Sequence, residues 1–279
     1  MSQQRDDALI EKLLPDFFHK HNPGAAWMHA VSIHLALPAL RALWTMSSIG
    51  YIQPECTDVS GQGNHLATPA AIGDVVFGYG PTGYPPTAYF WGLPNCYLFK
   101  ADGGGGANWA DTGTIWSDFQ ILDTQRGLTL GGWFWWPALP GAWQHLMSKD
   151  DLGANRQYAL MLTNTNQLRF ELFPGPTWAT STNTINVGWN HCIGIYDRTT
   201  QNQSVVLNGI VATNVGGAPA ALADSAAPFT IGADGAGGNR FTGYASLCWL
   251  QACSMYQAGT FDMVRALYHF VGPLYVRQE

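Results

Sequence analysis

The clearest structural signal in the chain is the stretch Ser204-Val205-Val206-Leu207-Asn208-Gly209-Ile210-Val211-Ala212. Two apolar runs rich in β-branched residues flank the dipeptide Asn208-Gly209. A type I′ turn needs positive φ at both central residues, and Asn-Gly meets that need better than most pairs. The stretch therefore predicts an antiparallel β-hairpin.

Further short strands surround this hairpin. Residues 158–162 and 168–172 flank Asn164-Thr165-Asn166, which predicts a second hairpin, and residues 128–136 and 190–196 are also expected to be strands. We place Trp133 and Trp135 in the core. Many short strands without helices between them are typical of an antiparallel sandwich or jelly roll. Residues 40–279 are therefore predicted to form one mainly β jelly-roll domain.

The first 39 residues follow a different pattern. Apolar pairs recur every four residues, which places them on one side of a helix. The pairs are Leu9-Ile10, Leu13-Leu14 and Phe17-Phe18. A second apolar segment, from about residue 25 to residue 37, stops at Pro38. Residues 1–39 are predicted to be a helical arm. Its apolar face packs either on the β domain or on a partner, as a docking or oligomerisation element.

Composition excludes several classes of protein. Only 11% of the 279 residues are charged, against about 25% in an average protein, and the net charge is −6 with no basic run, which argues against nucleic-acid binding. The N-terminus lacks the pattern of a secretory signal peptide. The most apolar stretch, residues 25–46, contains two histidines, Pro38 and Arg41 and is a poor membrane span. Five irregularly spaced cysteines predict reduced thiols.

Several motifs, in order, resemble the laminin-G-like branch of concanavalin A-like jelly rolls. The resemblance covers about residues 40–270 and implies a sandwich that ends in a short helix at residues 260–268. The matching segments are Ala42–Met46, Asp58–His65, Leu128–Trp136, Leu146–Lys149, Gly188–His191, Leu207–Gly209, Phe229–Gly232 and Phe241–Gly243.

The resemblance also implies a calcium site. In that family the D-x-S-G-x-G-N turn often helps to hold Ca²⁺, and here it gives Asp58 and Asn64 as candidate ligands. The family often adds an acidic residue after the F-x-G strand, whereas this chain has Ala245-Ser246-Leu247. The alternative is a purely structural Asx-type turn.

We expect no catalysis. Some folds of this class are glucanases with an E-x-D-x-x-E strand, but the four glutamates of this chain, Glu11, Glu55, Glu171 and Glu279, have no second carboxylate at that spacing. Asp150-Asp151 is predicted to be a solvated turn. The motifs G-x-S-x-G and H-E-x-x-H are absent from the sequence.

Two hypotheses about function remain. The first expectation is a structural or adhesion protein of a large assembly, a phage virion component such as a capsid decoration, neck or tail appendage. It would be an oligomer or part of a protein lattice, located in the virion or in the cytoplasm before assembly. The alternative is a carbohydrate-binding, lectin-like module, with Tyr84, Trp143 and Trp178 as the exposed rings that stack on sugars. A glycoside hydrolase of the same fold is the third and least favoured possibility.

Overall fold

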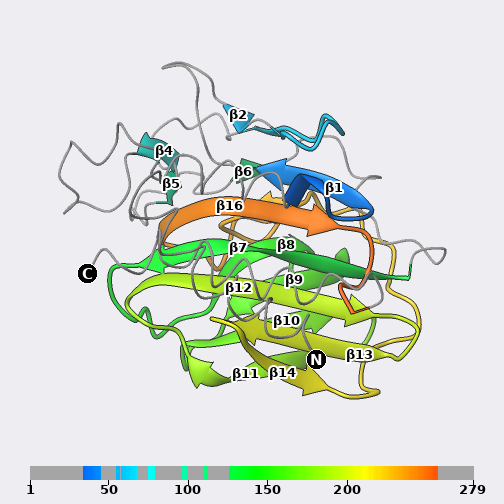
Figure 1. Ribbon diagram of the computed structural model, residues 1–279. Helices are drawn as coiled ribbons and strands as arrows, with labels where there is room; N and C mark the ends of the chain where they lie inside the picture. The colour runs from blue at the N-terminus through cyan, green and yellow to red at the C-terminus, as the bar shows by residue number, and fades with distance from the viewer. Residues whose placement is uncertain are drawn as a thin grey trace, which may run out of the picture.

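The computed structural model describes residues 34–44, 55–56, 58–67, 75–78, 96–99, 110–111 and 126–256, and in these residues the protein is a sandwich of two antiparallel sheets (Figure 1). Sheet A has the order β14-β13-β12-β7-β16-β5-β4, with β1 also paired to β16. Its strands are β1 (Leu40–Trp44), β4 (Val75–Gly78), β5 (Cys96–Phe99), β7 (Gly127–Trp136), β12 (Gly188–Asp197), β13 (Asn202–Leu207), β14 (Ile210–Asn214) and β16 (Gly243–Gln251).

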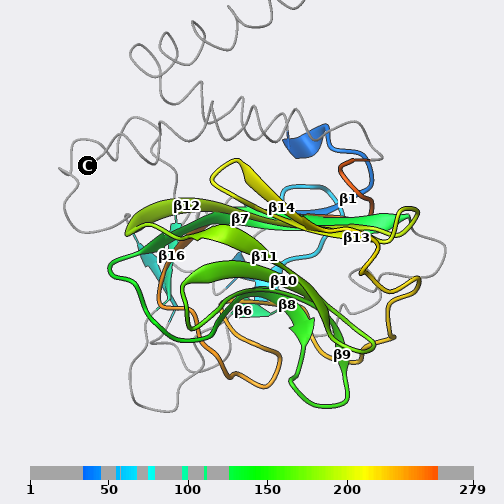
Figure 2. The same cartoon turned by 90° about the horizontal axis from the view of Figure 1, so that it is seen from below.

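Sheet B has the order β11-β10-β9-β8-β15-β6-β3-β2 and lies face to face with sheet A (Figure 2). Its strands are β2 (Glu55–Cys56), β3 (Leu66–Ala67), β6 (Ala110–Asp111), β8 (Gln144–Asp150), β9 (Arg156–Leu162), β10 (Gln167–Leu172), β11 (Thr177–Thr184) and β15 (Thr230–Ile231). The mainly β, antiparallel sandwich predicted from the sequence is therefore confirmed.

Both predicted hairpins are present. Asn208 and Gly209 have φ values of 51° and 80° and join β13 to β14, as a type I′ turn requires. β9 and β10 pair directly, and Asn166 in their turn has a φ of 61°. The local turn chemistry thus fixes the register of these strands.

The interior of the sandwich is made by alternate residues of the central strands. In β7 the side chains of Leu128, Leu130, Phe134 and Trp136 belong to the core cluster. Trp133 is buried, as predicted, but on the outer side of sheet A, to which the two-residue alternation of a strand turns the odd-numbered residues of β7. Trp135 lies on the same side and is only half-buried, so its placement in the core is wrong.

The outer side of sheet A is nonetheless buried. Trp133 stacks on His191 with ring centroids 4.7 Å apart, and Ile193 and Ile195 are also buried. Burial lowers the pKa of His191 to about 3, so this imidazole is neutral at physiological pH. His34, in a helical turn at residues 34–35, packs edge-on against Trp249 on this side at 5.8 Å.

Several predictions fall on residues outside the described ranges. They are the arm residues Leu9, Leu13, Phe17 and Phe18 and the C-terminal helix at residues 260–268. Within the described ranges, no helix has the length and hydrophobicity needed to span a membrane.

The described thiols are reduced, as predicted. Cys192 and Cys248 are buried and Cys253 is half-buried, and none of the three forms a disulfide. Burial raises the pKa of Cys253 to about 11, so the thiol is protonated at neutral pH and is a poor nucleophile.

Candidate functional site

Two exposed tryptophans and one arginine form a cluster on the outer face of sheet B. The side chains of Trp143 and Trp178 are 38% and 44% exposed, as the sequence predicted for these two rings. The guanidinium of Arg169 lies over both, with its Cζ 5.0 Å from the ring centroid of Trp143 and 4.7 Å from that of Trp178. Such distances are typical of cation–π contacts. Sequence reasoning found the two rings but missed the arginine that connects them.

Neighbouring strands hold this cluster in place. β10 alternates inward and outward residues, so Arg169 and Glu171 share the outer face while Leu168, Phe170 and Leu172 enter the core. Arg169 pairs with Met161 on β9 and with Thr180 on β11. Arg169, the centre of the cluster, therefore lies on a strand that is paired on both sides.

The two tryptophans approach Arg169 from opposite sides of β10. Trp178 lies on the neighbouring strand β11, and its carbonyl oxygen accepts a hydrogen bond from Nδ2 of Asn214 at 3.2 Å. Trp143 precedes β8 in a loop whose Gly141 N–H donates to Oδ1 of Asn166 at 2.9 Å. These bonds tie both ring-bearing segments to the sandwich.

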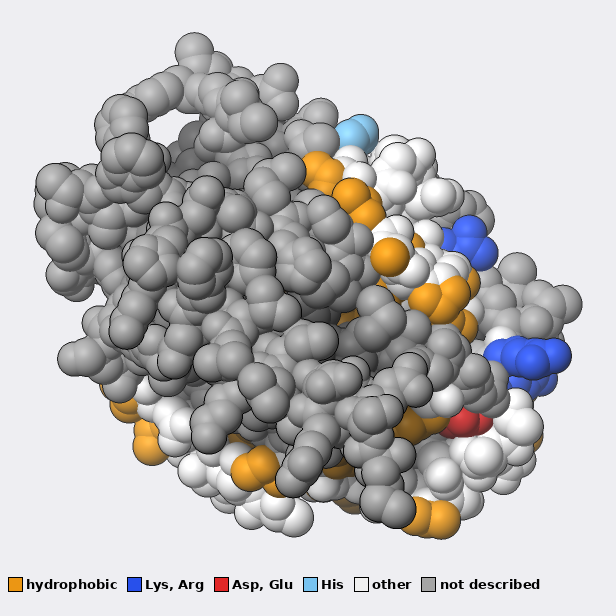
Figure 3. Space-filling model, in the orientation of Figure 1, with side chains coloured by type: hydrophobic (Ala, Val, Ile, Leu, Met, Phe, Trp, Pro, Cys, Tyr) orange, Lys and Arg blue, Asp and Glu red, His pale blue; other side chains and the backbone are white. Residues whose placement is uncertain are grey.

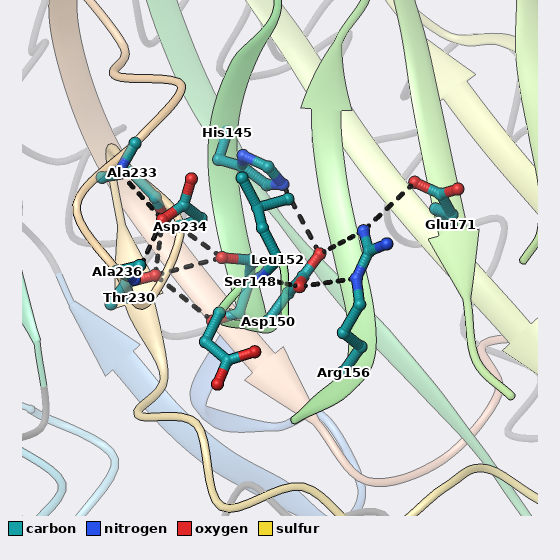
Figure 4. A network of polar contacts seen from close by, with 12 residues as sticks. His145, Ser148, Asp150, Leu152, Arg156, Glu171, Thr230, Ala233, Asp234 and Ala236 are labelled. Atoms are coloured by element: carbon teal, nitrogen blue, oxygen red, sulfur yellow. Dashed lines mark hydrogen bonds and ion pairs between the residues drawn. The ribbon is translucent and has the colours of Figure 1, made fainter. Parts of the chain in front are cut away.

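A row of ionisable side chains continues along the same sheet (Figure 4). Asp150 accepts two hydrogen bonds of 2.8 Å from Nε and Nη2 of Arg156, and Nε2 of His145 lies 3.8 Å from its Oδ2. On the other side, Nη2 of Arg156 lies 4.0 Å from Oε2 of Glu171. The guanidinium of Arg156 also covers the ring of Phe173 at 3.9 Å.

The two carboxyl groups of this row have opposite pKa shifts. Burial alone would raise the pKa of Asp150, but its contacts with His145 and Arg156 and the Leu152 amide outweigh burial and hold the pKa below its usual value. Burial raises the pKa of Glu171, and Arg156 and Arg169 offset only part of that effect. Asp150 is therefore firmly ionised at neutral pH.

The solvated-turn prediction for Asp150 is wrong. This residue is completely buried at the end of β8, because its carboxylate bonds to Arg156 and to the Leu152 amide. Asp151 does serve the turn: its Oδ1 accepts the N–H groups of Gly153 and Asn155 at 2.8 and 3.1 Å.

The loop at residues 232–241 lies along the other side of β8. Its Asn239 carbonyl accepts the His145 N–H at 2.7 Å, and the Gly235 N–H donates to the Asp150 carbonyl at 2.6 Å. Oδ1 of Asp234 accepts the N–H groups of Ala236 and Gly238 at 2.9 and 2.8 Å, which folds the loop on itself. The loop therefore bounds the outer face of sheet B opposite to the tryptophans.

The predicted calcium ligands lie together in a hydrogen-bonded turn. Oδ1 of Asp58 accepts the N–H groups of Leu43 and Ser60, and Oδ2 accepts the Asn64 N–H and the Ser60 hydroxyl, all at 2.8–3.0 Å. Nδ2 of Asn64 donates to the Arg41 carbonyl at 2.7 Å. Donors thus already surround the Asp58 carboxylate, as in a structural turn, whereas Oδ1 of Asn64 is buried without a hydrogen-bond partner.

The described residues contain no cluster of three or more His, Cys, Asp or Glu side chains arranged for a metal ion. Tyr84, the third aromatic candidate, lies outside the described ranges. Of the predicted site residues, the structure thus brings together two pairs, Trp143 with Trp178 through Arg169, and Asp58 with Asn64.

The stacked antiparallel sheets define a concanavalin A-like sandwich with a partly exposed face on sheet B. The chain belongs to the family Laminin_G_3 of the concanavalin A-like lectin/glucanases superfamily, whose model matches residues 104–247. A comparison by sequence with curated proteins finds no match.

Several solved structures share the fold at low sequence identity. The binding domain of Paraclostridial Mosquitocidal Protein 1 matches with a TM-score of 0.56 and 11% identity over 81% of this chain and 52% of that chain. The binding domain of Botulinum Neurotoxin DC in complex with SialylT matches with a TM-score of 0.52 and 10% identity over 85% and 52%.

A Trypanosoma rangeli sialidase matches with a TM-score of 0.55 and 14% identity over 90% of this chain and 38% of that chain. The chain thus spans about half the length of the two toxin binding domains and less than half of the sialidase. At such identities the likeness shows the fold alone.

Proposed function

We propose that this protein binds carbohydrate through the outer face of sheet B. The observation that carries the proposal is the pair of half-exposed rings, Trp143 and Trp178, both in contact with Arg169 on β10. The apolar C–H face of a sugar ring stacks on an indole, while polar groups beside the ring bind its hydroxyls. A toxin binding domain in complex with SialylT and a sialidase share the fold, which supports this reading.

We infer binding rather than cleavage. A glycosidase of the common type needs two carboxyl groups free to reach the glycosidic bond. Asp150 and Glu171 lie on the same face, but Asp150 is completely buried and both of its oxygens bond to Arg156. The Asp150 carboxylate is therefore held by the protein and is not available as a catalytic group.

An assay for released sugars tests this inference. The chain is incubated with the glycans that it binds, and product formation that Asp150→Asn or Glu171→Gln abolishes would contradict the inference.

A glycan array tests the binding proposal. We expect the intact chain to bind a subset of glycans and to lose that binding in Trp143→Ala and Trp178→Ala, with little change in melting temperature because both rings are half-exposed. Tyr256→Ala is the matched control, since Tyr256 is 39% exposed and follows β16 of sheet A. An array without any binding would refute the proposal.

A second candidate function is that of a structural or adhesion component of a large assembly. The edge strand β14 favours it, because Ile210 is 51% exposed and Val215, directly after the strand, is 78% exposed. Unpaired sheet edges with apolar side chains are common sites of protein association. In the view of Figure 3, few of the described side chains that can be seen are blue or red, in keeping with the 11% charge of the sequence.

The assembly that we propose under this second candidate is a phage virion, in which the domain would decorate a capsid, neck or tail. Native mass spectrometry of the intact chain tests it. A trimer, pentamer or hexamer that dissociates in Val215→Asp would support the proposal. A monomer at all concentrations would count against self-association, and failure to bind purified virions would count against a docking role.

A further inference from the structure

Arg169 forms no ion pair with any described residue. Among the described residues, Arg156 and His145 have carboxylate partners within 4.0 Å, whereas no carboxylate lies within that distance of Arg169. Glu171, two residues along the same face, lies 4.0 Å from Arg156 instead. The face therefore holds one cation without an ion-pair partner.

Polar atoms around this cation also lack hydrogen bonds. Nε of Arg169 is buried without a hydrogen-bond partner, and so are Oγ1 of Thr180, its neighbour on β11, and Nδ1 of His145. Buried polar atoms are nearly always paired in folded proteins. Their gathering on one face, beside two half-exposed indole rings, is typical of a surface that is completed by a ligand.

From this arrangement we propose that the ligand is an acidic sugar, recognised by its carboxylate. An arginine fork binds a carboxylate through two parallel N–H···O bonds, and the rings that flank Arg169 fix the plane of the fork and exclude water from it. Trp143 and Trp178 then stack on the sugar ring that bears the carboxylate. The inference rests on the proposed carbohydrate binding at this site. Uronic acids and sialic acids share the required chemistry.

The experiment compares one ligand with and without its charge. Isothermal titration uses the intact chain with a uronic-acid oligosaccharide and with the same oligosaccharide after reduction of its carboxyl groups, and a second arm uses a sialylated glycan and its asialo form. We expect the acidic form of one pair to bind roughly 10- to 100-fold more tightly than the neutral form, as a charged hydrogen-bonded pair provides.

Variants assign the effect to Arg169. Arg169→Met is expected to remove the preference for the acidic form, so that the acidic and neutral forms bind with equal affinity, whereas Arg169→Lys retains part of the preference because it keeps the charge but not the fork. Arg126→Met, an exposed arginine at the start of β7, is the matched control and keeps wild-type binding. Melting curves identify any variant that does not fold, and the comparison of ligands on the wild type does not depend on them.

The outcomes separate this inference from the proposed function. Equal affinity for acidic and neutral forms, with binding still lost in Trp178→Ala, refutes the proposal of an acidic ligand but not that of carbohydrate binding. A preference limited to sulfated glycans also overturns the carboxylate inference. No binding of any sugar refutes the proposed function itself.

Discussion

Replacement of Arg156 by methionine would break the ion pair that organises the outer face of sheet B. The substitution keeps much of the aliphatic volume next to Phe173 but leaves the Asp150 carboxylate, which is completely buried, with only the Leu152 amide and His145 nearby. Removing one partner of a buried ion pair costs about 3–5 kcal/mol, because the remaining charge is neither solvated nor paired.

The structure places the expected cost somewhat below that range. The Arg156 side chain is 26% exposed, so solvent already screens part of the pair. Since His145 also stays 3.8 Å from Asp150, we expect Arg156→Met to lower the free energy of unfolding by about 2–4 kcal/mol at pH 7.

The cost should depend on pH. In the wild type the depressed pKa of Asp150 contributes stability that is present at neutral pH and is lost as the pH falls through the folded-state pKa. Without Arg156, burial raises the pKa of Asp150, and the variant takes up a proton at a higher pH than the wild type does. The difference in stability between the two proteins therefore shrinks as the pH is lowered from 7 towards 4.

Urea unfolding at pH 7 and at pH 4, analysed by linear extrapolation, measures both effects. Arg126→Met controls for the loss of an exposed arginine and should change stability by less than about 0.5 kcal/mol. The double variant Asp150→Asn with Arg156→Met should be more stable than Arg156→Met alone, because the buried charge is gone. A cost below about 1 kcal/mol at pH 7, or an equal cost at both pH values, would refute the reasoning.

Three further predictions concern other parts of the sandwich. Lys149 is buried, donates to the Ala227 carbonyl at 2.7 Å and has its pKa lowered by burial to about 8. Because the unfolded chain keeps this proton up to about pH 10.4, stability measured by urea unfolding should rise by about 1 kcal/mol from pH 8 to pH 9 relative to Lys149→Met; parallel pH profiles would contradict this. At Gly194 an added Cβ would lie 2.6 Å from the Phe170 ring, so Gly194→Ala should cost about 1–3 kcal/mol in the same assay, and a change within 0.5 kcal/mol would argue against it. Removal of calcium by a chelator should leave the melting temperature unchanged, since hydrogen-bond donors already surround Asp58; a decrease that added Ca²⁺ reverses would instead support the calcium site.

The sequence predicts those parts of the fold that depend on local chemistry. Asn208-Gly209 selects a hairpin turn through backbone φ alone, and the alternation from Leu168 to Leu172 places Arg169 and Glu171 on one face without any tertiary information. The same alternation was the available signal for Arg169. This signal does not single out Arg169, because a single charged side chain in a strand commonly points into solvent.

The polar row could not be predicted, because it depends on irregular pairing. His145 and Asp150 are five residues apart, so regular alternation would direct them to opposite faces of sheet B. The β8–β9 pairing shifts register between His145 and Met147 and again between Lys149 and Asp150, and these bulges bring His145 within 3.8 Å of Asp150 and Asp150 next to Arg156. Nothing in the local sequence specifies where such bulges occur.

The faces of β7 were also hidden from sequence reasoning. A strand that is covered on both sides is apolar at every position, and periodicity then gives no indication of which residues enter the sandwich. Trp133 and Trp136 are both buried, yet only Trp136 belongs to the core between the sheets. The distinction requires the partner strands.

The structure shows that some of the few charged residues do not lie on the surface. Several of the few charged residues are buried at 5% exposure or less and therefore contribute little to the surface: Asp58, Lys149, Asp150, Asp197 and Asp234. The part of the surface that the structure describes thus carries fewer charges than its composition suggests. On such a surface few neighbouring charges weaken the field of one arginine, and two indole rings reduce the water around it. An unpaired Arg169 would then attract an anionic ligand more strongly than a similar residue on an ordinary, densely charged surface. Raising the ionic strength should therefore weaken binding of the acidic sugar and leave binding of its neutral form unchanged.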